Sequence, residues 1–238
     1  MFYVAGPTKL LIGDSLIKRL SSSDIKDCCI ISRPGRTFAS MTRDIRQGVV
    51  KVAQFSVVAT VLGTNDVDNL VYSRFGPVGY KVRSRNHHAP AHPMTLSHKH
   101  DDFIHLMCTI KDFNPQASLV ILAVIPRPGD WDWSKQFSYE LNDYMQKWCC
   151  TQQDAGSNAI FVPAYGMFQK SGQPVRAYFA GDGIHLNESG LFRLRQCLRQ
   201  ALADHNIASK GSWKRKPKGR GQPSGKRRRK EVGNLVYF

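Results

Sequence analysis

The chain has 238 residues, of which 42% are apolar and 10% aromatic, and its formal net charge is +16. This length suits one α/β domain with appendages. No apolar run approaches the roughly 18 residues of a membrane-spanning helix, and the amino terminus lacks the basic-then-apolar pattern of a secretory signal. The sequence therefore predicts an intracellular protein, cytoplasmic or nuclear, and the early first strand is compatible with a domain cut from a longer polypeptide.

Strand-like and helix-like segments alternate along the chain. Strands are predicted at 9–12, 28–32, 55–63, 118–126 and 159–164, and helices at about 38–49, 98–112, 134–150 and 188–204. The segment 55–63 is almost continuously apolar and β-branched, which is typical of a strand covered on both faces. The alternation predicts an α/β three-layer sandwich, in which helices cover both faces of a parallel sheet. The functional site of such a fold lies beyond the carboxyl ends of the strands.

Two stretches interrupt this pattern. The predicted domain covers residues 1–206, with an irregular loop at 67–97 that has little periodicity. Loops of this length inside compact domains are usually functional or disordered. Residues 207–238 are rich in Gly, Pro, Ser, Lys and Arg, so we expect a disordered basic tail.

The six cysteines are expected to be reduced and largely structural. Two adjacent pairs, at 28–29 and 149–150, fall inside a predicted strand and a predicted helix. The amino terminus shows no secretory-signal pattern, and no pair has the spacing of a zinc site. The sequence therefore predicts neither a disulfide framework nor a cysteine-bound metal.

Four short segments combine the residues that nucleophilic catalysis requires. They are GDSL at 13–16, PGRT at 34–37, GTND at 63–66 and DGIHL at 182–186. The first three follow predicted strands, so a parallel sheet brings them to one edge, and the fourth precedes the last helix. The entry to that helix can bring its residues to the same edge.

The residue types in these segments suit acyl transfer. Ser15 is a candidate nucleophile, His185 the base that takes its proton, and Asp182 the carboxylate that orients the ring. The backbone N–H groups of Ser15 and Gly35, together with the Asn65 amide, are candidate donors to the oxyanion. Gly35 suits this role because, without a Cβ, its backbone can approach a ligand closely.

Each of these residues also has a purely structural interpretation. Ser15 can be the N-cap of a helix. Asp182 and His185 can form a capping loop with a surface histidine, and Asn65 can be a turn residue. Asp14 and Asp66 are interpreted as structural, tying loops together through backbone amides.

In order and in residue type, the four segments resemble the four sequence blocks of the SGNH (GDSL-type) hydrolases. The resemblance covers residues 9 to about 204, and Ser15, Gly35, Asn65 and His185 stand at the four positions that name the family. It implies a flavodoxin-like five-stranded sheet of order 2-1-3-4-5, a triad completed by Asp182, and ester hydrolysis without a metal or cofactor.

Two finer resemblances concern the substrate and the setting. The segments at 35–67 and 114–127 are similar to small acetylhydrolases that act on platelet-activating factor. An intracellular-type hydrolase joined to a Lys/Arg tail resembles the esterase domain in the first open-reading-frame protein of vertebrate LINE retrotransposons. These resemblances imply a short acyl ester, acetyl above all, and a lipid-like substrate.

A histidine-rich stretch overlaps the irregular loop. Its members are His87, His88, His92, His98 and His100. A zinc cluster is one interpretation, but the spacing fits no common site and no cysteine accompanies it, which favours a solvated loop. Arg83 and Arg85 nearby can meet phosphate or simply be exposed.

The tail supplies most of the positive charge. Residues 210–230 hold eleven of the 34 Lys and Arg residues and no acidic residue. The candidate binding residues are Lys214, Arg215, Lys216, Lys218, Arg220, Lys226, Arg227, Arg228, Arg229 and Lys230. Their two clusters are compatible with a bipartite nuclear import signal, with RNA binding, with an anionic membrane, or with a solubilising role.

The sequence therefore predicts a serine esterase of the SGNH type with a basic tail that attaches it to nucleic acid or to an anionic membrane. The alternative is an adaptor that binds nucleic acid or membranes, as part of a retrotransposon ribonucleoprotein, and keeps the hydrolase fold without turnover. The enzyme is favoured because every catalytic position is filled.

Overall fold

The computed structural model describes residues 7–75, 95–130 and 132–208. Its centre is a five-stranded parallel sheet of order β2-β1-β3-β4-β5. The strands are β1 (Lys9–Gly13), β2 (Cys28–Ser32), β3 (Val57–Val61), β4 (Ser118–Leu122) and β5 (Ala159–Val162). The predicted flavodoxin-like α/β sandwich and its strand order are thus confirmed.

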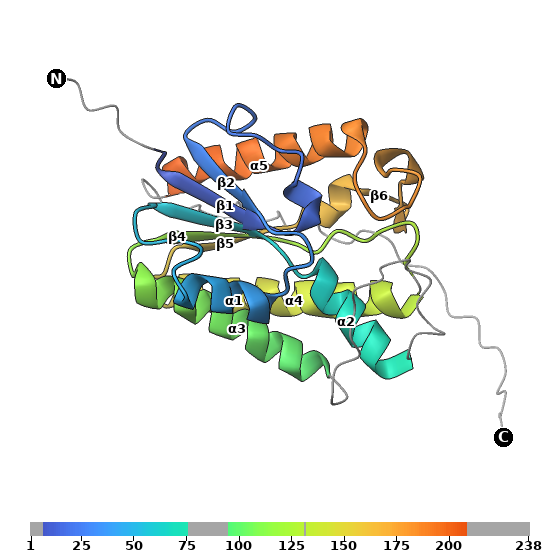
Figure 1. The fold of residues 1–238 in the computed structure, drawn as a ribbon, viewed down its shortest axis with the longest axis horizontal. Coiled ribbons are helices and arrows are strands. Elements are labelled where there is room, and N and C mark those ends of the chain that lie inside the picture. The colour runs from blue at the N-terminus through green and yellow to red at the C-terminus, as the bar shows by residue number, and fades with distance from the viewer. Residues whose placement is uncertain (1–6, 76–94, 131, 209–238) are drawn as a thin grey trace, which may run out of the picture.

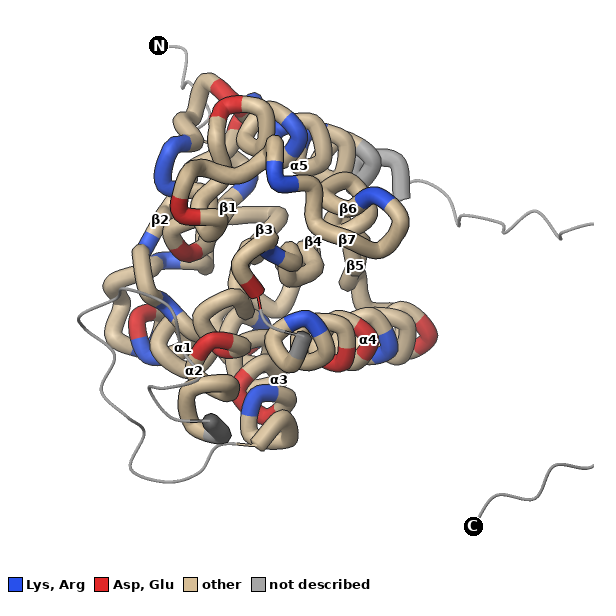
Figure 2. The backbone as a smooth tube through the Cα atoms, turned by 90° about the vertical axis from the view of Figure 1, so that its right-hand side faces the viewer, with Lys and Arg blue, Asp and Glu red and all other residues tan. Residues whose placement is uncertain are grey.

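Helices cover both faces of the sheet, which gives three layers (Figure 1). The helices are α1 (Phe38–Arg46), α2 (Thr64–Phe75), α3 (Leu96–Phe113), α4 (Asp132–Asp154) and α5 (Glu188–Ala208). One face packs against α1, α3 and α4, and the other against α5 (Figures 1 and 2). None of the helices within the described ranges combines the length and the apolar character needed to cross a bilayer.

Two apolar clusters, one on each face, hold the layers together. Alternate residues of a strand point to opposite faces, so Leu10 and Ile12 pack toward α1 while Leu11 packs toward α5. The central strands β3 and β4 are buried along their whole length. Burial on both faces explains why these strands read as continuous apolar runs.

The five predicted strands and four predicted helices all occur in the structure, and a first difference lies around the irregular loop. Helix α2 occupies Thr64–Phe75, so residues 67–75 are helical and not irregular. Val67, Leu70 and Val71 provide the reason, because they recur at helical spacing and each is almost completely buried. At its other end the predicted loop gives way to α3 at Leu96, and residues 76–94 lie outside the described residues.

The segment between β5 and α5 contains short elements that periodicity did not predict. They are the 3₁₀ helices η3 (Ala164–Met167) and η4 (Arg176–Tyr178) and the two-residue strands β6 (Gln169–Lys170) and β7 (Gln173–Pro174). Helix α5 extends to Ala208, two residues into the predicted tail, and residues 209–238 lie outside the described residues.

Candidate active site

The carboxyl edge of the sheet brings the first three segments together. In Figure 2 this edge faces the viewer, and the strands stand side by side in sheet order. Gly13 at the end of β1 lies in register with Ser32 of β2 and Val61 of β3. The backbone N–H of Asp14 donates to the Val61 carbonyl (3.2 Å), and that of Arg33 donates to the Gly13 carbonyl (2.8 Å). The loops after β1, β2 and β3 are therefore bonded to one another where the strands end.

Ser15 begins a short 3₁₀ helix, η1 (Ser15–Ile17), directly after β1. The N-cap of this helix is Asp14, whose carboxylate accepts the N–H of Leu16 at 2.9 Å. Ser15 is therefore not the cap, contrary to the structural interpretation of that residue. Within the described ranges the Ser15 hydroxyl has no hydrogen-bond partner, and the side chain is half-buried. The hydroxyl is thus unengaged at the edge of the sheet.

Glycine is required at position 13 because β1 and β3 approach closely there. A Cβ on Gly13 would lie 2.7 Å from the Val61 carbonyl oxygen and 2.8 Å from the Ile17 side chain. Any side chain would push η1 away from the sheet, and Ser15 with it. The glycine of the GDSL segment therefore positions the serine.

Gly35 lies in the exposed loop after β2, at a left-handed φ of +74°. Nothing lies within 4 Å of the position its Cβ would take, so the backbone is open on that side. The following residue, Arg36, is fixed by an ion pair with Asp44 of α1 (2.8 Å). This pair holds the loop in place while Gly35 remains accessible.

Asn65 lies in the first turn of α2 and reaches across to both neighbouring loops. Its Nδ2 donates to Asp14 Oδ2 at 3.2 Å and to the carbonyl oxygen of Arg36 at 3.1 Å. The amide therefore joins the loops after β1, β2 and β3. Both of its hydrogens are engaged, which the sequence did not predict.

Asp182 and His185 form a hydrogen-bonded pair just before α5. Asp182 Oδ1 accepts the N–H groups of Ile184 (2.8 Å) and His185 (3.0 Å), and Oδ2 lies 2.7 Å from His185 Nδ1. Partial burial would raise the pKa of Asp182, but the bonds from the ring and the two backbone groups outweigh it and lower that pKa to about 2. The carboxylate is therefore ionised and can only accept, so Nδ1 carries a hydrogen, and in the neutral ring Nε2 is left as an acceptor.

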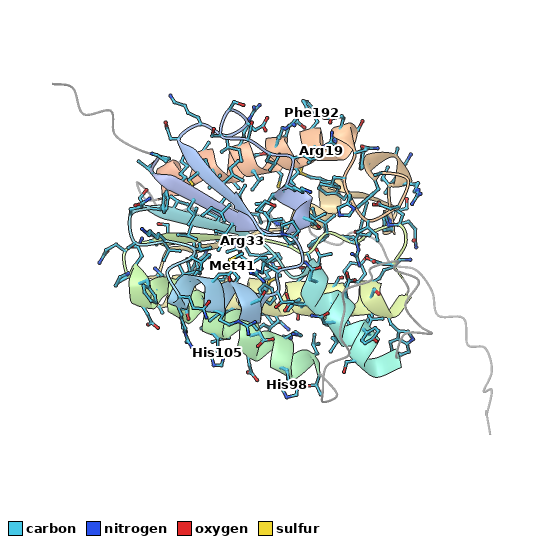
Figure 3. All side chains as sticks on the ribbon, viewed as in Figure 1. Arg19, Arg33, Met41, His98, His105 and Phe192 are labelled. Carbon is cyan, nitrogen blue, oxygen red and sulfur yellow. The ribbon has the colours of Figure 1, made fainter. Side chains whose placement is uncertain are left out.

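One ion pair and one electrostatic interaction connect this segment to the serine edge. Arg19, which follows η1, forms an ion pair with Glu188 at the start of α5. Figure 3 shows Arg19 beside the helix that carries Phe192. An electrostatic interaction with His185 also lowers the pKa of Asp14, which directly precedes the serine. No hydrogen bond joins Ser15 to His185 in the described part of the chain, and such bonds often tighten only when substrate is bound.

A buried cluster of charges that the sequence did not predict lies beneath the edge. Arg127, after β4, is 4% exposed and pairs with Asp68 of α2 and with Asp130. Burial alone would lower the pKa of Arg127, but the two neighbouring carboxylates outweigh burial and raise the pKa above its usual value. The cluster fixes the loop after β4, whose Gly129 lies beside Gly183 of the Asp182–His185 loop.

The charges of this cluster act on the pKa of Asp14. Burial raises the pKa of its carboxyl to about 6, against the lowering effects of the Leu16 N–H and of the charges on Arg127 and His185. The negative charge of Asp68 adds to the rise. Asp14 and Asp66 both accept backbone N–H groups, from Leu16 and Phe38 respectively, as the structural interpretation predicted.

No group of His, Cys, Asp and Glu residues in the described segments is arranged to hold a metal ion. Of the histidine-rich stretch, His98 caps α3 through the backbone of Thr95, and His100 stacks on Tyr144. Figure 3 shows His98 and His105 pointing away from the sheet. His87, His88 and His92 lie outside the described residues, as do Arg83, Arg85 and all the candidate binding residues of the tail.

The sheet order and the loops at its carboxyl edge define a flavodoxin-like α/β protein with Ser15, Asn65 and the Asp182–His185 pair at one edge. No family model and no curated protein matches the sequence, but solved structures match the fold. A protein from Streptococcus pneumonia provisionally described as a platelet activating factor is 16% identical, with 85% of both chains covered and a TM-score of 0.60. A GDSL-like lipase from Bacteroides thetaiotaomicron is 12% identical over 82% of this chain and 87% of its own, with a TM-score of 0.58.

A catalytic mutant of Axe2, an acetylxylan esterase from Geobacillus stearothermophilus, is also similar. It is 14% identical over 84% of this chain and 96% of its own, with a TM-score of 0.57. These matches show that the chain has the fold of GDSL-like lipases and acetyl-ester hydrolases. The esterase domain of the ORF1 protein from the zebrafish ZfL2-1 retrotransposon is 18% identical, with a TM-score of 0.40. A TM-score this low does not support a closer relationship, so the retrotransposon link stays a prediction.

Proposed function

We propose that the protein is a serine esterase in which Ser15 is the nucleophile, His185 the base and Asp182 the carboxylate that orients the base. The observation that carries this proposal is the 2.7 Å bond between His185 Nδ1 and Asp182 Oδ2, which leaves Nε2 free to accept a proton. The unengaged hydroxyl of Ser15 lies at the same edge of the sheet.

The reaction proceeds through an acyl-enzyme. Ser15 Oγ attacks the ester carbonyl and His185 Nε2 takes its proton, which yields a tetrahedral oxyanion. His185 then gives this proton to the leaving alcohol, and a water molecule repeats the sequence to release the acid. The backbone N–H groups of Ser15 and Gly35 and the amide of Asn65 stabilise the oxyanion.

The proposed substrate is a short acyl ester, acetyl above all. Acetylxylan esterase is among the proteins that share the fold, which supports this choice. The exposed position of Asp182 and His185, whose side chains are 44% and 50% exposed, supports a site open enough for a large alcohol group. A lipid-derived alcohol is therefore compatible with the proposal.

Hydrolysis of p-nitrophenyl esters of graded chain length by the full chain tests the proposal. Wild type should prefer acetate over longer acyl groups, and Ser15→Ala should lose nearly all activity at an unchanged melting temperature. Ser22→Ala is the matched control, because Ser22 is exposed and lies before β2, away from the carboxyl edge. Equal rates for wild type and Ser15→Ala would refute the role of the serine.

We further propose that the basic tail attaches the protein to a phosphate-bearing polyanion, either RNA or an anionic membrane. Eleven positive charges within 21 residues support this. Each phosphate contacted contributes about −0.7 on single strands to the slope of log K against log salt. Binding should therefore fall steeply with salt, and deletion of 209–238 should abolish it without changing ester turnover.

RNA and phosphatidylserine vesicles, each at two salt concentrations, distinguish the two polyanions. Salt-insensitive binding that survives the deletion would place the interaction on the folded domain and favour the adaptor without turnover. This result would not depend on whether Ser15→Ala retains esterase activity.

A further inference from the structure

Asp14 is an almost completely buried carboxylate that accepts two hydrogen bonds on two different oxygens. The residue is 1% exposed. Oδ1 accepts the N–H of Leu16 in the turn that carries Ser15, and Oδ2 accepts Nδ2 of Asn65. One carboxylate thus joins the turn of the proposed nucleophile to the side chain of a proposed oxyanion donor.

The existing hydrogen bonds of Asn65 restrict how it can donate to an oxyanion. An amide nitrogen has two hydrogens, and both are already donated, one to Asp14 and one to the carbonyl of Arg36. Asn65 can therefore donate to an oxyanion only if one of these acceptors gives way. The bond to Asp14 involves a carboxylate and is the stronger type, whereas the bond to Arg36 involves a neutral carbonyl in an exposed loop beside Gly35.

We infer that Asp14 is the positioning residue of Asn65: its ionised carboxylate holds the amide at the oxyanion site while the second hydrogen passes from the Arg36 carbonyl to the substrate oxyanion. This inference rests on the proposed esterase function and deepens it. Asp14 acts through Asn65 and does not touch the reacting atoms.

The inference requires the charged form of Asp14. A carboxylate accepts at both oxygens, whereas an amide presents one oxygen acceptor and one donor group, and a protonated acid turns one of its oxygens into a donor that accepts only weakly. The neutral side chain can therefore satisfy either Leu16 or Asn65 but places a donor against the other. The groups that act on Asp14 are Arg127, Asp68 and His185, and together with burial they set its pKa to about 6. Asn65 should lose its anchor as the pH falls through this value.

Nuclear magnetic resonance of the ¹⁵N-labelled full chain tests the anchor without any substrate. Asn65→Ala identifies the side-chain amide signals of Asn65 by their loss. In wild type these signals should move with pH with a midpoint near 6, and in Asp14→Asn they should not. The matched control is His185→Gln, which should keep the titration because Asp14 remains. Movement that persists in Asp14→Asn would come from another group, such as the buried Asp66 beside Asn65, whose pKa is raised to about 7. Amide signals that do not move between pH 5 and 7, or that move equally in Asp14→Asn, would overturn the inference.

Kinetics of the double variant provide the second readout. Asp14→Asn alone should lower kcat by about 10-fold to 100-fold, less than the 10²–10³ expected for complete loss of one oxyanion donor. In the Asn65→Ala background the same substitution should change kcat by less than 2-fold, since its target is gone. If the kcat losses of Asp14→Asn and Asn65→Ala multiply in the double variant, the inference is overturned, but the esterase proposal is unaffected. A wild type without any Ser15-dependent turnover would refute the esterase, and the amide titration would then still decide whether Asp14 anchors Asn65. If Asp14→Asn does not fold, the titration in wild type, His185→Gln and Asp66→Asn decides it, because Asp66 is the other buried carboxyl with a raised pKa beside Asn65.

Discussion

Replacing Asp14 with asparagine should change how the stability of the protein depends on pH. Burial raises the pKa of this carboxyl from 3.8 to about 6 in the folded chain. The folded state therefore binds the proton more tightly than the unfolded state does, and wild-type stability falls as the pH rises between these two values. At about 1.4 kcal/mol per pKa unit, the total loss is about 3 kcal/mol.

Asparagine does not titrate, so the variant lacks this loss. Its constant penalty, a replaced hydrogen bond of about 1–3 kcal/mol, is the same at every pH. The free energy of unfolding of Asp14→Asn, taken relative to wild type, should therefore rise by about 3 kcal/mol as the pH increases, with most of the rise between pH 4 and 7. Urea unfolding at half-unit pH steps measures this difference.

The control is Asp182→Asn, because the pKa of Asp182 is lowered to about 2. A lowered pKa gives stability that is present above the unfolded value and is lost only as the pH falls toward 2. The difference between Asp182→Asn and wild type should therefore be nearly constant from pH 4 to 7. A constant difference for Asp14→Asn as well would refute the raised pKa of Asp14, and a falling difference would refute its direction.

Four further outcomes follow from the structure. Asn65→Ala should lower kcat by about 10²–10³ with a smaller change in KM, whereas a pure KM effect in steady-state kinetics would make Asn65 a binding residue only. Asp182→Asn should lower kcat/KM by several orders of magnitude at every pH, because the His185 ring loses its orienting acceptor; a near-normal rate across a pH series would contradict that role. Lys99 of α3 lies 3.5 Å from the fully buried Asp66 and 2.9 Å from the partly exposed Asp102. Lys99→Met should destabilise the fold by about 3–5 kcal/mol in urea at pH 8, where Asp66, whose pKa is raised to about 7, is ionised and loses its cation, while Asp102→Asn should cost less than about 1 kcal/mol; equal losses would show that the Asp66 pair does not dominate. Gly13→Ala should cost about 1–3 kcal/mol in thermal unfolding, because its methyl would lie 2.7 Å from the Val61 carbonyl oxygen, and an unchanged melting temperature would contradict the close approach.

The sequence predicted the parts of the fold that depend on local patterns. Buried strands such as β3 are nearly continuous apolar runs, and amphipathic helices such as α1 carry apolar residues at helical spacing. Helix α2 was missed although Val67, Leu70 and Val71 have that spacing, because polar residues surround them and the following segment has no periodicity. The hairpin of β6 and β7 has two residues per strand, too few for any period to appear.

Within the candidate site, residue types were predictable and partners were not. The spacing of Asp182 and His185 within one loop made their pairing foreseeable. Arg127 and Asp68 lie 59 positions apart, and no local pattern connects a residue after β4 to one on α2. The engagement of both Asn65 hydrogens depends equally on where the fold places the Arg36 carbonyl, which only the three-dimensional arrangement of the loops reveals.

Covalent labelling of Ser15 is the most direct test of the esterase. Diethyl p-nitrophenyl phosphate phosphorylates an activated serine and releases p-nitrophenol, so peptide mass mapping of the treated full chain locates the nucleophile. One diethylphosphoryl group per chain is expected on Ser15, absent in Ser15→Ala and formed much more slowly in Asp182→Asn. No adduct at Ser15 at neutral pH, or an adduct at another serine that persists in Ser15→Ala, would contradict the assignment of the nucleophile.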